Sequence, residues 1–240
     1  LTIGRLLLQR QRRSEHEQDL YQIVDQLNHG LHLVEDEQER MQIARLNLQA
    51  ARAARQASAF ETGLAYAKAG IALLDENSWE QDYDLTLELQ EQAALTACAA
   101  GNIPAMEQHS EQVLRFGRDP LDLARVQRLH IELLLSSKHF DEAIDYGLRA
   151  LRSLGQELPP RPDMAFTIAK LSELLERLES EPPDYFSMPR LYDQDPELLA
   201  VSEILFPVGN AAFISRPPLA PLAYMHILDL ALERRLLPER

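Results

Sequence analysis

The sequence contains a single cysteine, Cys98, among its 240 residues. One thiol excludes an internal disulfide, and it excludes a zinc site built mainly from cysteines. Cys98 lies among small residues in the segment TACAAG, where we interpret it as a buried, inert thiol.

Basic residues are scarce: 24 Lys and Arg stand against 38 Asp and Glu, which gives a formal net charge of -14 at pH 7. Proteins bind nucleic acid mainly through clustered positive charge, so this balance argues against a nucleic-acid partner. The acids concentrate between Asp75 and Glu91, where no basic residue intervenes. We interpret that run as the solvated start of a helix, because the helix dipole favours carboxylates in a first turn.

Long apolar runs are absent as well. No stretch approaches the ~18 uninterrupted apolar residues of a membrane-spanning helix, and the first residues lack the charge order and cleavage site of a signal peptide. The mean hydropathy of -0.28 is typical of a globular protein. We therefore expect a cytoplasmic protein with no membrane partner. Because the sequence begins with Leu1 and stops where a helix has barely ended, we also expect it to be a fragment of a longer chain.

Runs of alternating polar and apolar residues are missing, whereas apolar residues recur at intervals of three and four almost throughout. This pattern predicts α-helices and no strands. Asp36, Asp119 and Asp195 are expected to cap helix starts, and Gly30 and Gly117 to close helices in a left-handed conformation. The predicted helices span residues 1–13, 17–29, 37–56, 59–74, 82–100, 104–116, 120–136, 140–154, 163–179, 196–206 and 219–235.

Three segments of the sequence resemble one another, and they begin at Ser58, Gly101 and Lys138. Each opens with a bulky residue and continues with mostly small residues at matched offsets. The bulky residues are Phe60, Ile103 and Phe140, followed three positions on by Gly63, Met106 and Ala143, seven on by Ala67, Ser110 and Gly147, and ten on by Gly70, Val113 and Ala150. Small side chains at these offsets indicate a helix that crosses closely over its partner, while larger ones fill the gaps between hairpins.

The segment FDEAIDYGLRAL resembles the second helix of a tetratricopeptide repeat, and the other two segments resemble it less closely, with Met106 at a position that is usually small. The bulky residues are 43 and 37 positions apart, longer than the family's usual ~34. The resemblance implies an all-α fold of tetratricopeptide-like antiparallel helical hairpins stacked into a right-handed superhelix. Proline-rich breaks lead us to expect a regular repeat array over residues 1–157, and less regular hairpins that continue it over 158–240.

A more specific likeness covers roughly residues 1–155. The phrases IGRLLL, QIVDQLNHG, ERMQIARLNLQAARAARQASAFETGLAYAKAGIALL and SWEQDYDLTLELQEQAA are similar to the helical region of multidomain bacterial and fungal signalling proteins. Those proteins combine a serine/threonine-kinase-like domain, a signal-transduction ATPase, this helical region, and often a GAF module and a histidine kinase. The resemblance implies a linker and sensor region that relays ligand or partner binding to output domains.

Motifs that carry catalysis are missing. The sequence has no GxxxxGK[ST] phosphate loop, no HRD or DFG triplet, and no GxSxG or HExxH motif in a credible context. We therefore expect no enzymatic activity and no cofactor. His29 and His32 could share a helix face as metal ligands, but Gly30 intervenes and further ligands are not evident, so no metal site is predicted. We interpret His130 as a core or groove histidine.

The first helix of each tetratricopeptide hairpin lines the concave surface of the stack, so the resemblance implies a groove with known offsets. The positions are Arg45, Leu48, Arg52 and Arg55, then Glu88, Glu91 and Leu95, then Arg125, Arg128 and Glu132. Guanidinium groups bind carboxylates in pairs of hydrogen bonds, so such a groove could hold an acidic peptide or an anionic small ligand. The alternative is that these arginines and glutamates pair with one another across a solvated surface.

Two aromatic features offer further alternatives. Trp79 is expected to wedge one hairpin against the next, with a partner-binding anchor as the second interpretation. The segment at 181–189 is either a long loop packed on the last hairpins or a docking loop.

These observations favour a non-catalytic regulatory scaffold within a large signalling ATPase or kinase. Its partners would be proteins or peptides, including neighbouring domains of the same polypeptide, and a homodimer stays open. The alternative is a sensor that binds an anionic metabolite in the concave groove. A hydrolase or transferase with an unrecognised site is a third hypothesis.

Overall fold

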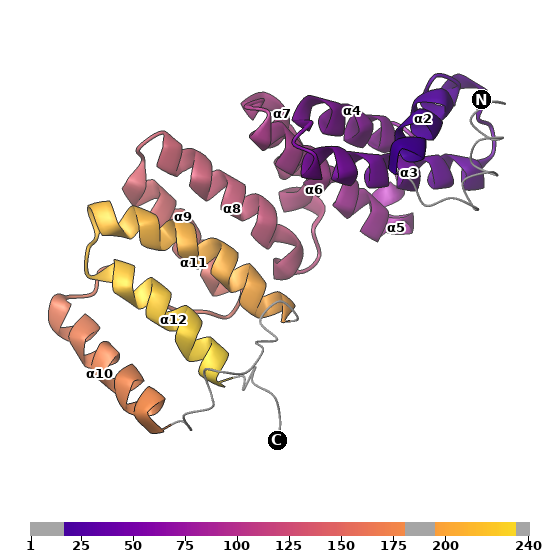
Figure 1. Ribbon diagram of the computed structural model, residues 1–240. Coiled ribbons are helices and arrows are strands. Elements are labelled where there is room, and N and C mark those ends of the chain that lie inside the picture. Colours follow the sequence, from indigo (N-terminus) through magenta and orange to yellow (C-terminus); the bar gives the residue numbers. More distant parts are fainter. Residues whose placement is uncertain (1–16, 181–194, 234–240) are drawn as a thin grey trace. The chain divides into compact units, whose positions relative to one another are not determined.

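The structure, a computed structural model, describes residues 17–180 and 195–233 (Figure 1). Within these ranges the chain forms eleven α-helices and one short 3-10 helix, and it forms no strand. The prediction of an all-α fold is confirmed for this part of the chain. The predicted helix at 1–13 and the segment at 181–189 lie outside the described residues.

Tertiary contacts divide the chain into two compact units, Leu1–Gly117 and Arg118–Arg240. In the N-terminal unit the helices are α2 (Glu17–Asn28), η1 (Leu31–Leu33), α3 (Glu37–Gln56), α4 (Phe60–Ile71), α5 (Ser78–Gln81), α6 (Tyr83–Ala99) and α7 (Ile103–Phe116). Helices α3 and α4 form one hairpin and α6 and α7 another, and α4 and α6 join them. This unit therefore contains two stacked helical hairpins.

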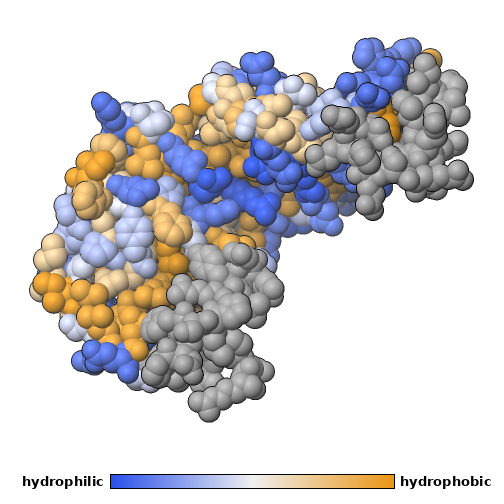
Figure 2. All heavy atoms as spheres, in the orientation of Figure 1, coloured by the Kyte–Doolittle hydropathy of each residue, from blue (hydrophilic) through white to orange (hydrophobic). Residues whose placement is uncertain are grey.

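In the C-terminal unit the helices are α8 (Pro120–Ser136), α9 (Phe140–Ser153), α10 (Met164–Ser180), α11 (Pro196–Ser215) and α12 (Leu219–Glu233). Helices α8 and α9 pair, α11 packs on both of them, and α12 packs on α11 (Figure 1). Although α10 follows α9 in the sequence, it packs on α12, at the far end of this layer from α8 and α9. Apolar side chains gather at the surface over α10 (Figure 2).

The turns inside the three hairpins repeat one backbone pattern. Each has a residue in the left-handed region, Ser58 (φ 59), Gly101 (φ 71) or Lys138 (φ 62). Each also closes the first helix with a bond that spans five residues: Ala59 N–H to Ala54 O, Asn102 N–H to Ala97 O, and His139 N–H to Leu134 O, at 2.8, 2.9 and 2.8 Å. The sequence repeat is therefore a repeat of turn geometry, of the kind that ends helices with a left-handed residue.

The prediction that Gly30 and Gly117 are left-handed is wrong. Gly30 has φ -106 and Gly117 has φ -59 with an extended ψ of 135. Left-handed residues lie instead in the three hairpin turns, where the chain must reverse over two or three residues, and at Gly155 (φ 74), just after α9. Outside the hairpins, the chain leaves Gly117 in an extended conformation that leads directly to the cap of α8.

The predicted N-caps are confirmed. Asp36 accepts a hydrogen bond from Glu39 N–H at 3.3 Å, and Asp195 accepts one from Leu198 N–H at 2.9 Å. Asp119 forms a capping box with Asp122 at the start of α8. These caps satisfy amide groups that have no partner inside the helix, which explains why the starts of α3, α8 and α11 match the prediction.

Small side chains lie where the helices cross. Gly63 is buried and Ala143 has no exposed surface. A Cβ at Gly63 would lie 3.2 Å from the carbonyl oxygen of Ala51 on α3, and one at Gly70 would lie 2.7 Å from Leu89 Cδ2 on α6. The predicted role of these positions is confirmed within each unit. A superhelix that runs through both units stays a prediction.

Helix α11 differs from its prediction. It was expected to end at residue 206, before Pro207, but it continues through this proline to Ser215. Eleven of its residues are buried, and this burial offsets the lost backbone hydrogen bond. By length and composition α11 could cross a membrane, with a hydropathy of 1.6 over 18 residues, but 61% of that window is buried against the rest of the chain. Such burial is typical of a core helix, so this is weak evidence for a membrane span.

The short helix α5 and the 3-10 helix η1 were not predicted, because segments of four and three residues are too short to show a period. The division expected at residue 157 rested on the regularity of the repeat and stays a prediction. The contact division after Gly117 places α8 to α12 in one unit, where α11 and α12 share one core with α8 and α9 and α10 packs on α12.

Replacement of Gly147 by alanine tests the close crossing of α9 and α11. A Cβ at this position would collide with Val208 Cγ2 on α11. We expect Gly147→Ala to lower the free energy of unfolding by about 1–3 kcal/mol, although alanine favours helix in isolation. The measurement is urea unfolding of the single variant and of the same change in a Val208→Ala background, where the cost should fall below about 0.5 kcal/mol. An equal cost in both backgrounds would show that the two helices do not meet here.

Candidate functional site

The predicted groove residues of the N-terminal unit lie mainly on α3. Arg45, Arg52 and Arg55 are all exposed. Their spacing of seven and three residues places them on one side of the helix, while Leu48, also predicted to line the groove, is 4% exposed and belongs to the core. Helix α3 therefore presents a row of arginines on its outer side.

The acidic groove residues on α6 have two different environments. Glu88 is half-buried and its carboxylate lies 3.1 Å from Arg52 Nη2, so α3 and α6 are joined by an ion pair. Glu91 is only 5% exposed, and α6 is buried on most sides by α3, α4, α5 and α7. Glu91 therefore contributes to the interior of the unit, and Leu95 is half-buried.

The remaining predicted residues lie on α8 in the C-terminal unit. Arg125 is exposed, and Arg128 and Glu132 are half-buried. Arg128 Nη1 donates to Glu132 Oε1 at 2.7 Å, one helical turn away. The eight charged residues predicted to line the groove thus form two sets, five in one unit and three in the other. Within these sets Arg52 pairs with Glu88 and Arg128 with Glu132, as the alternative of internal pairing predicts.

The histidines do not assemble a metal site in the described ranges. No group of three or more His, Cys, Asp and Glu there has the geometry to hold a metal ion. The ring of His29 hydrogen-bonds to the Asp25 carbonyl at 2.6 Å, and the ring of His130 is tilted against that of Tyr146, with the centroids 5.9 Å apart. Cys98 is only partly buried, so the prediction of a buried thiol is wrong in degree.

Trp79 lies on α5 and stacks on Phe116 at the end of α7, with the ring centroids 5.3 Å apart. Its ring is also 5.8 Å from that of Tyr83 at the start of α6. Trp79 thus packs α5 against the second hairpin. A wedge of one hairpin against the next stays a prediction. One further buried polar contact supports this hairpin: His109 Nδ1 lies 2.7 Å from Gln90 Oε1, and burial lowers the pKa of His109 to about 4.

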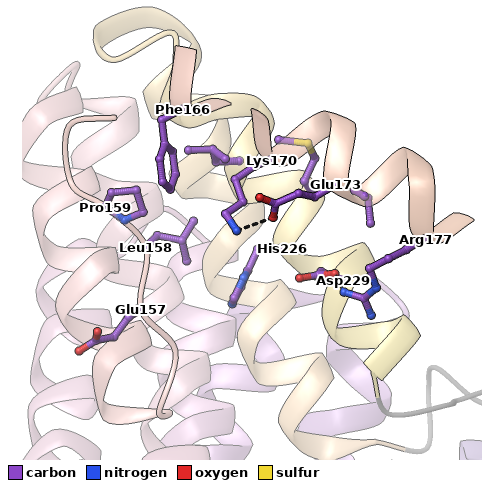
Figure 3. A pocket seen from close by; sticks show the side chains of 12 residues that line it. Glu157, Leu158, Pro159, Phe166, Lys170, Glu173, Arg177, His226 and Asp229 are labelled. Atoms are coloured by element: carbon purple, nitrogen blue, oxygen red, sulfur yellow. Dashed lines mark hydrogen bonds and ion pairs between the residues drawn. The ribbon is translucent and has the colours of Figure 1, made fainter. Parts of the chain in front are cut away.

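A pocket of about 280 Å³ lies in the C-terminal unit, between α10, α12 and the connection that follows α9 (Figure 3). Helix α10 contributes Phe166, Lys170, Glu173, Leu174 and Arg177 to it. Helix α12 contributes Leu222, Met225, His226 and Asp229, and the connection contributes Glu157, Leu158 and Pro159. The pocket combines an apolar floor with charged groups of both signs.

The charged groups of the pocket are arranged in pairs. Lys170 Nζ lies 2.6 Å from Glu173 Oε2, which raises the pKa of Lys170, and Arg177 forms an ion pair with Asp229 (Figure 3). His226 Nε2 lies 2.9 Å from Gln156 Oε1. Burial lowers the pKa of His226, although the carboxylate of Asp229 acts in the opposite direction. The imidazole is therefore neutral near pH 7 and can donate or accept a hydrogen bond.

Arg216, which is 9% exposed, holds one wall of this pocket in place. Its guanidinium donates to Asp141 Oδ1 and Asp145 Oδ1 on α9, both at 2.8 Å, and to the Pro160 carbonyl at 3.3 Å. One arginine at the end of α11 therefore fixes both the start of α9 and the connection that lines the pocket. At the other side, Thr167 Oγ1 of α10 donates to the Pro218 carbonyl at 2.8 Å.

Sequence reasoning missed the pocket and the role of Arg216. The prolines at 158–162 marked a break in the helices, but they do not show that α10 packs on α12. The signal that was present is the composition of MAFTIAKLSELLERLES, which is apolar on more of its circumference than one partner helix can cover.

Comparison with known proteins gives one distant likeness to a signalling protein. The chain is 21% identical over 173 residues to Hybrid signal transduction histidine kinase G of Dictyostelium discoideum. The match covers 68% of this chain, and the chain spans 5% of the length of that relative. No known protein family matches the sequence, and no solved structure matches it. The likeness is consistent with a signalling role.

Replacement of Arg216 by alanine tests whether the contacts of Arg216 with α9 and with the Pro160 carbonyl hold the pocket wall in place. Loss of three hydrogen bonds from a buried guanidinium is expected to lower the free energy of unfolding by about 1–3 kcal/mol, with Asp141 and Asp145 recovering solvation because they are exposed. Urea unfolding measures the effect. The matched control is Arg149→Ala on the exposed side of α9, expected to cost less than about 0.5 kcal/mol. If the two variants lower the free energy of unfolding equally, Arg216 does not hold the pocket wall in place.

Proposed function

We propose that this chain is a non-catalytic interaction module of a signalling protein, and that it binds an acidic peptide or an acidic segment of a neighbouring domain through α3. The observation that carries the proposal is the exposed row of Arg45, Arg52 and Arg55 on one helix of an acidic chain. The distant likeness to a signalling histidine kinase supports the signalling context. A cytoplasmic location, and a place inside a large ATPase or kinase, are part of the same proposal.

The two sides of α3 have different environments: one packs on α4, and the other faces solvent. Its inner side carries Ala44, Ala51 and Ala54, which are almost fully buried and let α4 approach closely. The outer side has no such packing task, so its arginines add little to the stability of the fold. Each guanidinium offers donors in a planar fork that matches a carboxylate. The Arg52–Glu88 ion pair shows this recognition within the chain itself, with both partners still partly exposed to solvent.

Charge reversal on α3 tests the proposal. The double variant Arg45→Glu, Arg55→Glu is expected to weaken binding of a fluorescent Asp- and Glu-rich peptide at least 100-fold, since each charge-assisted contact contributes about 1.5–3 kcal/mol. Anisotropy titration at low and physiological salt measures the loss. Lys68→Glu is the control, because Lys68 is exposed on α4 of the same unit and changes the net charge in the same direction. If the control variant loses as much peptide affinity as the double variant, the loss comes from net charge and not from a site on α3. If the double variant binds the peptide as tightly as the wild type, α3 is not the binding site.

The pocket between α10 and α12 favours a second candidate function, a small-ligand sensor. Two cations and three carboxylates line it together with a neutral imidazole and an apolar floor. This balance suits a small zwitterion with an apolar group better than the simple anion expected from the sequence, because each cation already has a carboxylate partner.

Thermal-shift measurements with amino-acid-like zwitterions test the sensor. We expect the melting temperature to rise with hydrophobic zwitterions and to change little with the matched carboxylic acids or amines. Met225→Trp, which fills part of the pocket, should abolish the shift. A panel that gives no shift in the wild-type chain would count against the sensor while leaving the α3 proposal intact.

A further inference from the structure

Helix α10 carries large apolar side chains on a side that no described helix covers. Met164, Ile168, Leu171 and Leu175 are 53%, 57%, 43% and 49% exposed. Their spacing of four, three and four residues places them in one stripe along the helix, called here the α10 stripe. Figure 2 shows apolar side chains at the surface in this region. Scattered exposed leucines are ordinary, but a continuous stripe of this kind is typical of a binding surface.

The position of α10 explains why the stripe is open. The inner side of α10 packs on α12 through Thr167 and Leu174, the two residues of this helix that are buried. Because α10 is the last helix of its layer, its other side has no neighbour among the described helices. Helical stacks usually end in a helix with a polar outer side, which keeps the end soluble. The α10 stripe departs from this rule because it is apolar. An apolar outer side is typical of a surface on which another helix packs.

The charges beside the stripe indicate which helix fits. On the side away from α12, the stripe is bordered by small residues, Ala165, Ala169 and Ser172, which allow close approach of a second backbone. Toward the end of α10 the border is acidic, with Glu176 and Glu179 both exposed. The bases of α10 lie elsewhere, since Lys170 and Arg177 line the pocket and pair with Glu173 and Asp229.

We propose that the α10 stripe binds an amphipathic helix of a partner protein that carries Leu-like side chains at heptad spacing and Lys or Arg on its border. Basic side chains would face Glu176 and Glu179 and the negative end of the α10 dipole. A partner helix in the antiparallel orientation would place its positive N-terminal end at the same place. This surface lies in the C-terminal unit, so the inference is independent of the arginine row on α3.

Two other occupants, a second copy of the chain and its own segment at 181–194, fit the charges less well. A second copy of the chain would bring an acidic border to an acidic border, in a protein with a net charge of -14. The chain's own segment at 181–194 carries Glu181, Asp184 and Asp193 against one base, Arg190, so it would bring acids to an acidic border. A basic amphipathic helix meets both the apolar stripe and its acidic border.

The test uses a synthetic 18-residue amphipathic peptide with leucines at heptad positions and lysines on the border. Its controls are a scrambled peptide of the same composition and a version with glutamate in place of each lysine. Isothermal titration with the whole chain is expected to show binding of the first peptide at least tenfold tighter than either control. The triple variant Ile168→Ser, Leu171→Ser, Leu175→Ser should lose this binding by at least tenfold. Phe213→Ser is the matched control, since Phe213 is 76% exposed on α11, and it should bind like the wild type.

Two further readouts separate the alternative occupants. Light scattering should show the wild-type chain and the triple variant with the same mass, and a wild-type dimer that dissociates in the variant would overturn the proposal in favour of a second copy. The melting temperature of the triple variant should equal that of the wild type, and a fall of several degrees would show that the chain itself covers the stripe. Equal binding of the basic and scrambled peptides would also overturn the proposal.

Discussion

Close approach of helix backbones is the constraint on which both units depend. Where α4 crosses α3 and α6, and where α9 crosses α11, the space between the helices leaves no room for a side chain. Glycines therefore occupy the crossing points at 63, 70 and 147, and the larger side chains around them fill the core. Because the crossings fix how the hairpins stack, they also decide which side of each helix is left to face outward. The arginine row of α3 and the stripe of α10 are consequences of this arrangement.

Regular packing makes much of the fold readable from the sequence. Helices α3 and α8 begin and end at the predicted residues, because a capping Asp marks each start and the following hairpin turn marks each end. The segments that resemble a repeat do share one turn geometry at Ser58, Gly101 and Lys138. In these regions the local signal and the tertiary structure agree, so a pattern of residues is sufficient.

Predictions from the sequence were wrong or missing where long-range contacts outweigh local conformational preference. Pro207 signals a helix end, but burial of α11 between α8, α9 and α12 carries the helix through it. Nothing local in the sequence of α10 shows that it packs on α12, so the pocket between them could not be predicted. The composition of α10 did signal that one partner helix would not cover all of its apolar surface. The groove itself stays a prediction, and its predicted residues have different environments: α3 presents its arginines to solvent, whereas Glu91 faces the core because α6 has helices on several sides. Residue positions carried over from a regular repeat do not predict which side chains are buried by additional neighbouring helices.

The surfaces of the two units offer different chemistry. The N-terminal unit has bases on α3 beside acids on α6, which suits a flexible acidic chain, while the C-terminal unit has an apolar stripe with an acidic border and a small pocket under the same helix. This division agrees with a role in signalling, to which the distant histidine-kinase likeness also points.

The central claim, that helices meet at glycine-sized crossings, is tested most directly by a cross-link between α9 and α11. A Cβ at position 147 lies 3.6 Å from the Cβ of Val208, a distance that suits a disulfide. In a Cys98→Ser background, the pair Gly147→Cys and Val208→Cys should oxidise completely in the folded protein, with the linked peptides identified by mass spectrometry. Two free thiols after oxidation of the folded chain would contradict the account.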